Sequence, residues 1–188
     1  MNIIVAITGA SGAIYGIRLL EELNKKEITT HLLISKWGRL TIETETDYSV
    51  ANVRRLASFS YDEEDLSAAI ASGSFKWTGM AIAPCSMKTL SGVSAGYSGD
   101  LITRAADVTI KEKRNLVLMV RETPLSPIHL ENMLRLARIG VTIMPPVPAF
   151  YAKPLTVEDI VNQTVWRIMD LFGVETPDLK RWGSWQKR

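Results

Sequence analysis

The sequence holds one cysteine and two histidines among its 188 residues. With Cys85 alone, no disulfide can form within the chain, and no basic leader segment precedes the first apolar run. We therefore expect the protein in the cytoplasm. His31 and His129 are too far from Cys85 along the chain to share the ligand spacing of a metal site. The sequence predicts no bound metal.

Long apolar runs and a strong excess of one charge are also absent. No apolar run approaches the ~20 residues that a membrane-spanning helix needs. The 22 basic residues are nearly balanced by 20 acidic ones, which argues against nucleic-acid binding driven by net charge. What the chain does have is 46% apolar residues, enough for the core of one ordinary domain.

Short apolar runs that end in turns alternate with amphipathic segments. Strands are predicted at residues 2–7, 29–34, 80–83, 116–120 and 141–144. Helices are predicted at residues 13–24, 86–95 and 101–114, and at 52–72 with a break near 58–62. Three more helices are predicted from their capping residues: one that begins after Ser35, one from Ser126 to Gly140 and one from Thr156 to 172. The alternation indicates one α/β domain over residues 1–188. Its expected fold is a three-layer, Rossmann-like (flavodoxin-like) parallel sheet with helices on both faces. Residues 174–188 are expected to form a C-terminal tail.

Ligands of such sheets bind outside the carboxyl ends of the strands. Five segments lie there, and all are rich in hydroxyl groups, glycine, proline or charge. They are residues 8–12, 35–36, 84–89, 121–122 and 145–151.

The first of these segments is the turn Thr8-Gly9-Ala10-Ser11-Gly12, between a predicted strand and a predicted helix. Its backbone N–H groups favour a phosphate or cofactor, although glycines also serve simply to make a tight turn. The turn resembles the NADP-binding turn of short-chain dehydrogenases. Two features oppose that assignment: the second strand ends in Ser35 instead of an acidic residue, and the chain has no Tyr-x-x-x-Lys pair.

The loop Pro84-Cys85-Ser86-Met87-Lys88-Thr89 gathers several donors at a helix start. It suits a phosphate or the polar edge of a ring, and an ordinary serine cap beside a solvated lysine is the alternative. Cys85 has no histidine partner in the sequence pattern, so we interpret it as a buried filler and not as a nucleophile.

Charged residues at helical spacing and at strand ends suggest an anion site. Arg104 and Lys111 share one helix face, which either binds a phosphate or is simply solvated. Glu122 follows Arg121 directly after a strand, and the pair suits either a general base or a structural ion pair. Tyr151 follows a stiff proline-rich loop. Arg167 interrupts the apolar pattern of the last predicted helix, and Trp182 lies in the polar C-terminal tail.

Several motifs recur together in one order along nearly the whole chain. They are residues 8–13, 35–36, 43–46, 72–75, 84–90, 104–108, 116–124, 129–133 and 148–151. In this set the chain resembles the flavin prenyltransferase family, the UbiX-like proteins once called phenylacrylic or aromatic acid decarboxylases.

The resemblance implies a metal-independent reaction. Reduced FMN is alkylated by dimethylallyl phosphate at N5 and then C6, which gives inorganic phosphate and prenylated FMN for a UbiD-type decarboxylase. It also implies a homododecamer whose tail, with Trp182, docks on a neighbouring subunit. Direct decarboxylation of aromatic acids and a non-catalytic FMN-binding role are the alternatives.

The resemblance also assigns residues to roles. The FMN contacts implied are Gly9, Ala10, Ser11, Gly12, Ser35, Ser86, Met87, Lys88, Thr89 and Arg121. The dimethylallyl phosphate contacts implied are Arg104, Lys111, Tyr151 and Arg167. The residues implied at the reacting centre are Glu122, Glu45, Ser11, Arg121 and Trp182.

Overall fold

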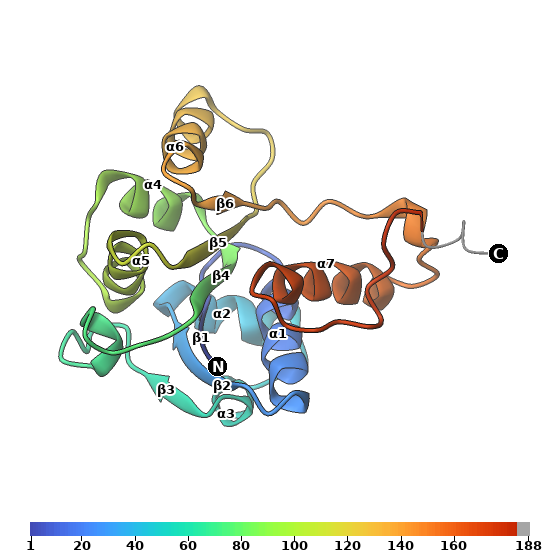
Figure 1. Ribbon diagram of the computed structural model, residues 1–188, viewed down its shortest axis with the longest axis horizontal. Coiled ribbons are helices and arrows are strands. Elements are labelled where there is room, and N and C mark those ends of the chain that lie inside the picture. The colour runs from blue at the N-terminus through green and yellow to red at the C-terminus, as the bar shows by residue number, and fades with distance from the viewer. Residues whose placement is uncertain (184–188) are drawn as a thin grey trace.

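A computed structural model describes residues 1–183 and contains a six-stranded sheet in the order β3-β2-β1-β4-β5-β6 (Figure 1). Every neighbouring pair of strands is parallel. The strands are β1 Asn2–Ile7, β2 Thr29–Ile34, β3 Phe59–Tyr61, β4 Gly79–Cys85, β5 Asn115–Val120 and β6 Thr142–Ile143. The strand order is that of the Rossmann type, so the predicted fold class is confirmed.

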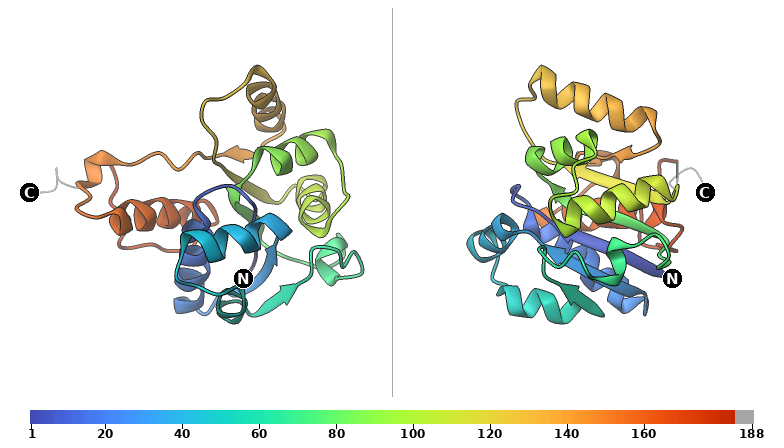
Figure 2. Two further views of the ribbon diagram at one scale, coloured as in Figure 1. Left: turned by 180° about the vertical axis from the view of Figure 1, so that it is seen from behind. Right: turned by 90° about the vertical axis from the view of Figure 1, so that its left-hand side faces the viewer.

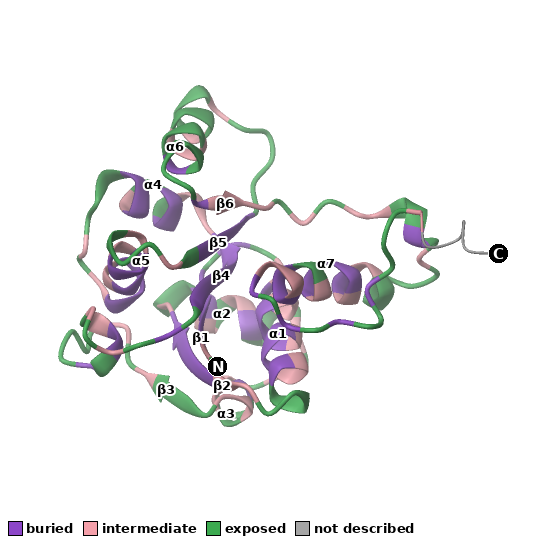
Figure 3. Ribbon diagram, in the orientation of Figure 1, coloured by how far each residue is buried: buried purple, intermediate pink, exposed green. Residues whose placement is uncertain are grey.

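Helices cover both faces of this sheet. They are α1 Ala13–Lys25, α2 Lys36–Glu45, α3 Val50–Leu56, α4 Met87–Ala95, α5 Leu101–Lys111, α6 Pro127–Arg138 and α7 Val157–Leu171, with the 3-10 turns η1 Ala69–Ala71 and η2 Phe150–Ala152. Alternate residues of β1 point to opposite faces, as strand geometry requires. Ile3 and Val5 pack with α1 and α7 in one apolar cluster, whereas Ile4 and Ala6 pack with α4 and α5 in the other. Both clusters are buried against the sheet (Figure 3).

The predicted helix caps are confirmed. Each cap oxygen accepts the backbone N–H three residues further on: Ser35 from Gly38, Ser126 from His129 and Thr156 from Asp159. The Nδ1 atom of His129 in turn accepts the N–H of Ser126, at 3.2 Å. His129 is therefore part of a capping box.

The prediction for residues 52–72 is partly wrong. A short helix is present, but the expected break is a third strand, β3, which pairs with β2 at the edge of the sheet. The rings of Phe59 and Tyr61 both stack on His31 of β2, at 5.1 and 5.8 Å between ring centroids. Tertiary pairing therefore overrides the local helical pattern. The fourth strand also runs through Pro84, where we expected it to stop, with a shift of register between Ile82 and Cys85.

The strand order reverses at β1, and this creates the crevice that positions the site. The chain leaves β1 toward β2 and β3, then returns to place β4 on the other side of β1. The hydroxyl of Thr8 donates to the carbonyl of Pro84 at 2.7 Å and accepts the N–H of Ser86 at 2.9 Å. Thr8 is buried. The loops that follow β1 and β4 are therefore held together by one side chain.

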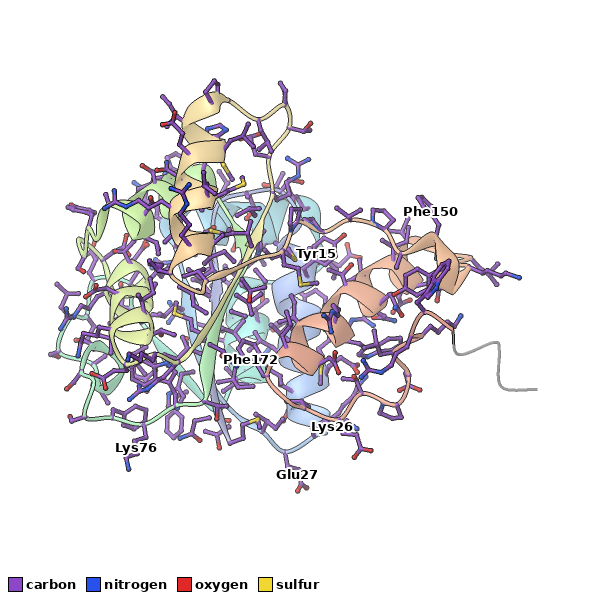
Figure 4. The ribbon with its side chains drawn as sticks, turned by 45° about the horizontal axis from the view of Figure 1, so that its top comes forward. Tyr15, Lys26, Glu27, Lys76, Phe150 and Phe172 are labelled. Atoms are coloured by element: carbon purple, nitrogen blue, oxygen red, sulfur yellow. The ribbon has the colours of Figure 1, made fainter. Side chains whose placement is uncertain are left out.

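Two parts of the chain project from the sheet. One is α6, and the other is an arm of residues 144–156 that includes η2 (Figures 1 and 2). Both carry exposed apolar side chains: Ile128 on α6 is 68% exposed, Phe150 is 74% exposed and Leu155 is 92% exposed. Phe150 lies at the outer end of the arm (Figure 4). Such surfaces are typical of subunit interfaces.

Over residues 1–183, no helix is both long enough and apolar enough to cross a membrane.

We expect Thr8→Val to destabilise the fold. Valine keeps the shape but leaves the partly buried N–H of Ser86 without the hydroxyl acceptor, which costs about 1–3 kcal/mol. The midpoint of urea unfolding should fall, whereas Thr8→Ser, which keeps the hydroxyl, should lie close to the parent. Equal midpoints for the valine variant and the parent would contradict this role of the hydroxyl.

Candidate functional site

A cleft of about 550 Å³ opens at the carboxyl ends of β1, β2 and β4. Five of the ten residues predicted to contact FMN line it together: Gly9, Ser35, Ser86, Lys88 and Thr89. The volume falls within the range of about 300–1,000 Å³ that is usual for ligand pockets. The structure therefore brings together residues from three separate loops of the sequence.

The hydroxyl groups in this cleft lie at two helix N-termini. Ser35 caps α2, and Ser86 caps α4 by accepting the N–H of Thr89 at 3.3 Å. The hydroxyls of Ser86 and Thr89 are 3.1 Å apart and hydrogen bonded. Helix N-termini carry partial positive charge, so the shared opening of α2 and α4 favours an anion such as a phosphate.

The turn at residues 8–12 was predicted to bind a phosphate through its backbone N–H groups, but a carboxylate of the protein already occupies part of it. The carboxylate of Glu45 accepts the N–H groups of Gly12, at 2.7 Å, and of Ala13, at 3.3 Å. The N-terminus of α1 therefore already holds a negative charge from the protein itself. Glu45 is thereby placed next to Ser11, as expected if both lie at the reacting centre. Gly12 takes a left-handed conformation, with φ of 101°.

The remaining residues of the flavin set lie around the same edge of the sheet. Ala10 is buried, Ser11 is exposed, and Met87 is half-buried against the core that contains α4 and α5. The N–H of Arg121 donates to the carbonyl of Cys85 at 3.2 Å, so the end of β5 adjoins the loop after β4. Glu122 is exposed and its carboxylate accepts the N–H of Thr123 at 2.9 Å.

A second cleft, of about 420 Å³, lies between α7, the arm and the tail. It contains three of the predicted residues, Tyr151, Arg167 and Trp182, and the rings of Tyr151 and Trp182 meet edge to face at 5.5 Å. Lys180 and Arg181 also line it. The cleft thus combines cations with an aromatic wall.

The tail is fixed along α7 by polar contacts. The buried side-chain amide of Gln163 donates to the carbonyl of Lys180 at 2.8 Å and accepts its N–H at 3.3 Å. The carboxylate of Asp170 pairs with both Arg167 and Arg181. Because Arg181 hydrogen bonds to Asp170, the pKa of that carboxyl is lowered. Residues 184 and 185, part of the predicted docking tail, lie outside the described residues.

Arg104 and Lys111 are not near this second cleft. The Nε atom of Arg104 donates to the carbonyl of Ala71 at 3.1 Å, and its guanidinium pairs with Asp107. Lys111 pairs with Glu112 beside Gly73. Their helix, α5, and the arm that carries Tyr151 lie on opposite sides of the molecule (Figures 1 and 2). The four residues predicted to hold the prenyl phosphate therefore form two separate groups in one chain.

Sequence reasoning did not select several residues of the two clefts. In the first cleft they include Trp37, Glu63, Tyr97 and Asp100. Glu63 was missed because it follows β3, a strand that was not predicted. In the second cleft, Arg181 was missed although it directly precedes Trp182, a position that could have drawn attention to it.

Metal ligands do not gather in the described part of the chain, where no group of three or more His, Cys, Asp or Glu side chains has the geometry of a metal site. Cys85 is fully buried, and burial raises the pKa of its thiol to about 12. The thiol is therefore protonated at neutral pH, which agrees with its interpretation as a filler.

Comparisons with known proteins place the chain in a family. The profile of the Flavoprotein family matches residues 1–169. A probable UbiX-like flavin prenyltransferase of Streptomyces sp. is 55% identical over 98% of this chain and 92% of its own length. The chain is a member of the UbiX-like flavin prenyltransferase family. The resemblance predicted from its motifs is confirmed.

Solved structures of UbiX-like proteins match the fold over its whole length. A crystal structure of AnUbiX (PadA1) in complex with FMN and dimethylallyl pyrophosphate has a TM-score of 0.96 and 51% identity, and the match covers 98% of each chain. A dodecameric FMN-dependent UbiX-like decarboxylase from Escherichia coli O157:H7 has a TM-score of 0.94 and 54% identity, over 97% of this chain and 99% of that one.

We expect Asp170→Asn to loosen the tail that carries Trp182. Loss of the carboxylate charge weakens both arginine pairs, while the contacts of Gln163 remain. Tryptic cleavage after Lys180 or Arg181 in the native protein should become a few-fold faster. Asp178→Asn, which removes the same charge from an exposed tail position, should leave the rate unchanged. Equal cleavage rates for the Asp170 variant and the parent would show that the tail does not depend on this carboxylate.

Proposed function

We propose that this protein is a flavin prenyltransferase that moves a dimethylallyl group from dimethylallyl phosphate to N5 and C6 of reduced FMN. The C–O bond to phosphate would break as the C–N bond forms with loss of the N5 proton, and inorganic phosphate would leave. The C–C bond would form by net addition of C6–H across the allyl C=C bond, so that the C6 proton is lost and the allyl group gains one. The observation that carries the proposal is the gathering of Gly9, Ser35, Ser86, Lys88 and Thr89 in one cleft of a chain that belongs to this family.

The first cleft suits FMN by its chemistry. Hydroxyls at the N-termini of α2 and α4, with the ammonium of Lys88, match a phosphate group, and Trp37 adds an aromatic residue to the lining of the cleft. We assign FMN to Gly9, Ala10, Ser11, Gly12, Ser35, Ser86, Met87, Lys88, Thr89 and Arg121. When bound, reduced FMN supplies the nucleophilic ring atoms.

Side chains of the protein would stabilise the charges that develop in the reaction and would accept the proton that is released. Departure of phosphate concentrates negative charge, which Arg104, Lys111, Arg167 and the hydroxyl of Tyr151 would stabilise. Trp182 and the proline-rich arm would provide an apolar wall with an aromatic face for the developing allyl cation. Glu122 would accept a proton, and Glu45 would hold the turn that presents Ser11. In this proposal no metal takes part.

The separation of the two cationic groups supports a site shared between subunits. Arg104 and Lys111 lie across the molecule from Tyr151 and Arg167, so one chain cannot present all four to one phosphate. Exposed apolar residues on α6 and the arm offer the interfaces that such sharing needs. We propose a homododecamer of single FMN-binding domains in which the tail of residues 174–188 docks on a neighbour.

The product would serve a UbiD-type decarboxylase, and we propose the cytoplasm as its location. Both remain predictions from the resemblance and from the single cysteine.

The activity can be tested with purified protein under anaerobic conditions. Incubation with reduced FMN and dimethylallyl phosphate should give a flavin heavier by one prenyl unit, together with inorganic phosphate, measured by mass spectrometry and a phosphate assay. Unchanged flavin mass would overturn the proposal. Release of CO₂ from a hydroxybenzoate or cinnamate by the protein alone would favour direct decarboxylation, the activity named for the Escherichia coli neighbour.

The shared site predicts complementation between inactive variants. Arg104→Leu and Arg167→Leu should each abolish turnover, because each removes one of the cationic groups. In mixed oligomers, intact sites arise where the two groups come from different chains, so random mixing should restore roughly a quarter of the parental activity. Subunits mixed after dissociation and reassembly provide the measurement. No recovery would mean that both arginines act within one chain, or that one of them has no role in the site.

A further inference from the structure

Glu63 is a carboxylate inside the first cleft to which neither the motifs nor the family resemblance gives a role. Its side chain accepts the N–H of Lys36 at 2.6 Å, at the first turn of α2. Its backbone carbonyl accepts the N–H of Leu101 at 2.7 Å, at the start of α5. The side chain is only 17% exposed. Glu63 is thus fixed between two helices, in the same cleft as Ser35 and Ser86.

Charged groups of both signs face this carboxylate. Arg39 of α2 has its guanidinium 3.7 Å away, and Lys88 of α4 lines the same cleft. The neighbours of like charge are Asp100 at the cap of α5, together with Asp62 and Glu64 on the same segment as Glu63. Asp100 is held in place because its carboxylate accepts the N–H of Thr103 at 2.8 Å.

A phosphate group in this cleft would add about two negative charges at neutral pH. The anion and Glu63 would then share the N-terminus of α2, where one carboxylate already uses a backbone donor. Like charges in a partly buried space disfavour each other's ionised form. The cost falls if the carboxyl becomes neutral, and the cations and hydroxyls that would hold the phosphate favour its ionised form, which leaves Glu63 as the group that takes up the proton.

We propose that Glu63 takes up a proton when the phosphate group of FMN binds in this cleft, so that FMN affinity falls as pH rises. The inference rests on the proposed FMN site. Protonated Glu63 is neutral, so binding is strongest at low pH and weakens as free Glu63 becomes ionised. Burial raises the pKa of this carboxyl, while the N–H of Lys36 and the charge of Arg39 oppose the increase. Protonation of Glu63 therefore removes one negative charge from the cleft when an anionic ligand enters it.

The decisive measurement is the dissociation constant of FMN from pH 6 to 9 for the full-length protein and for Glu63→Gln. Glutamine keeps an acceptor for the N–H of Lys36 but carries no charge. At the high-pH end of this range the variant should bind FMN more tightly than the parent, by up to about tenfold for a pKa change of one unit on binding. The difference should shrink as the pH falls and free Glu63 gains its proton. Ionisation of free FMN is common to both proteins and cancels in the comparison.

Two controls isolate the effect. Glu64→Gln removes the same charge from the adjacent, exposed residue of the same cleft and should keep the pH dependence of the parent. Riboflavin, which lacks the phosphate, should bind the parent and Glu63→Gln equally at every pH. Calorimetry in two buffers of different ionisation enthalpy should detect proton uptake with FMN in the parent, at the pH values where the affinities of the parent and Glu63→Gln diverge, and a smaller uptake in Glu63→Gln.

The outcomes separate this inference from the function on which it rests. Parallel pH curves for the parent and Glu63→Gln would overturn the inference while leaving the FMN site intact. The inference would also be overturned by equal effects of the two glutamine variants, or by a riboflavin response that matches that of FMN. Absence of FMN binding to the parent at any pH would overturn both the inference and the proposed flavin site.

Discussion

The hydroxyl of Thr8 joins the two loops on which the proposed FMN cleft depends. It sits where the strand order reverses, and it binds the backbone of Pro84 and Ser86 from the end of β1. Without this hydroxyl, the backbone N–H of Thr8 would still donate to the carbonyl of Pro84 at 3.2 Å, but the N–H of Ser86 would lose its link to the end of β1. A buried hydroxyl with both its donor and its acceptor used fixes their separation, and therefore fixes the width of the crevice between them.

Around this crevice, carboxylates bind the N-termini of three helices. Glu45 reaches α1 and Glu63 reaches α2 from other segments of the chain, whereas Asp100 is the N-cap residue of α5 itself. By contrast, α4 begins at the neutral hydroxyl of Ser86, and its first turn holds no acidic residue. An anionic ligand is repelled where carboxylates already sit and attracted where a helix opens onto the cleft beside a neutral cap. Within the opening shared by α2 and α4, the pattern of caps thus supports our proposal that the phosphate contacts Ser86 and Thr89, with ionised Glu63 opposing it on the side of α2.

The sequence was sufficient to predict the strands and helix caps that depend only on neighbouring residues. The short apolar runs that end in turns located the strands at residues 2–7 and 29–34 to the residue, and Ser35 and Thr156 were identified as caps. The third strand was missed because Phe59 and Tyr61 pair with His31 across a long separation in sequence. Glu63 and Arg181 were missed for the same reason, since their roles come from contacts with α2 and α7 and not from any motif. The separation of Arg104 from Arg167 also depends on the fold alone.

The arm that carries Tyr151 has a consequence for the thermodynamics of assembly. Pro145, Pro146, Pro148 and Pro154 restrict its backbone, and the ammonium of Lys180 donates to the carbonyl of Ala152 at 2.8 Å and ties the arm to the tail. Such a segment has already lost most of its conformational entropy before any neighbour arrives. A subunit that packs against it therefore gains the burial of Phe150 and Leu155 without first having to order a flexible loop.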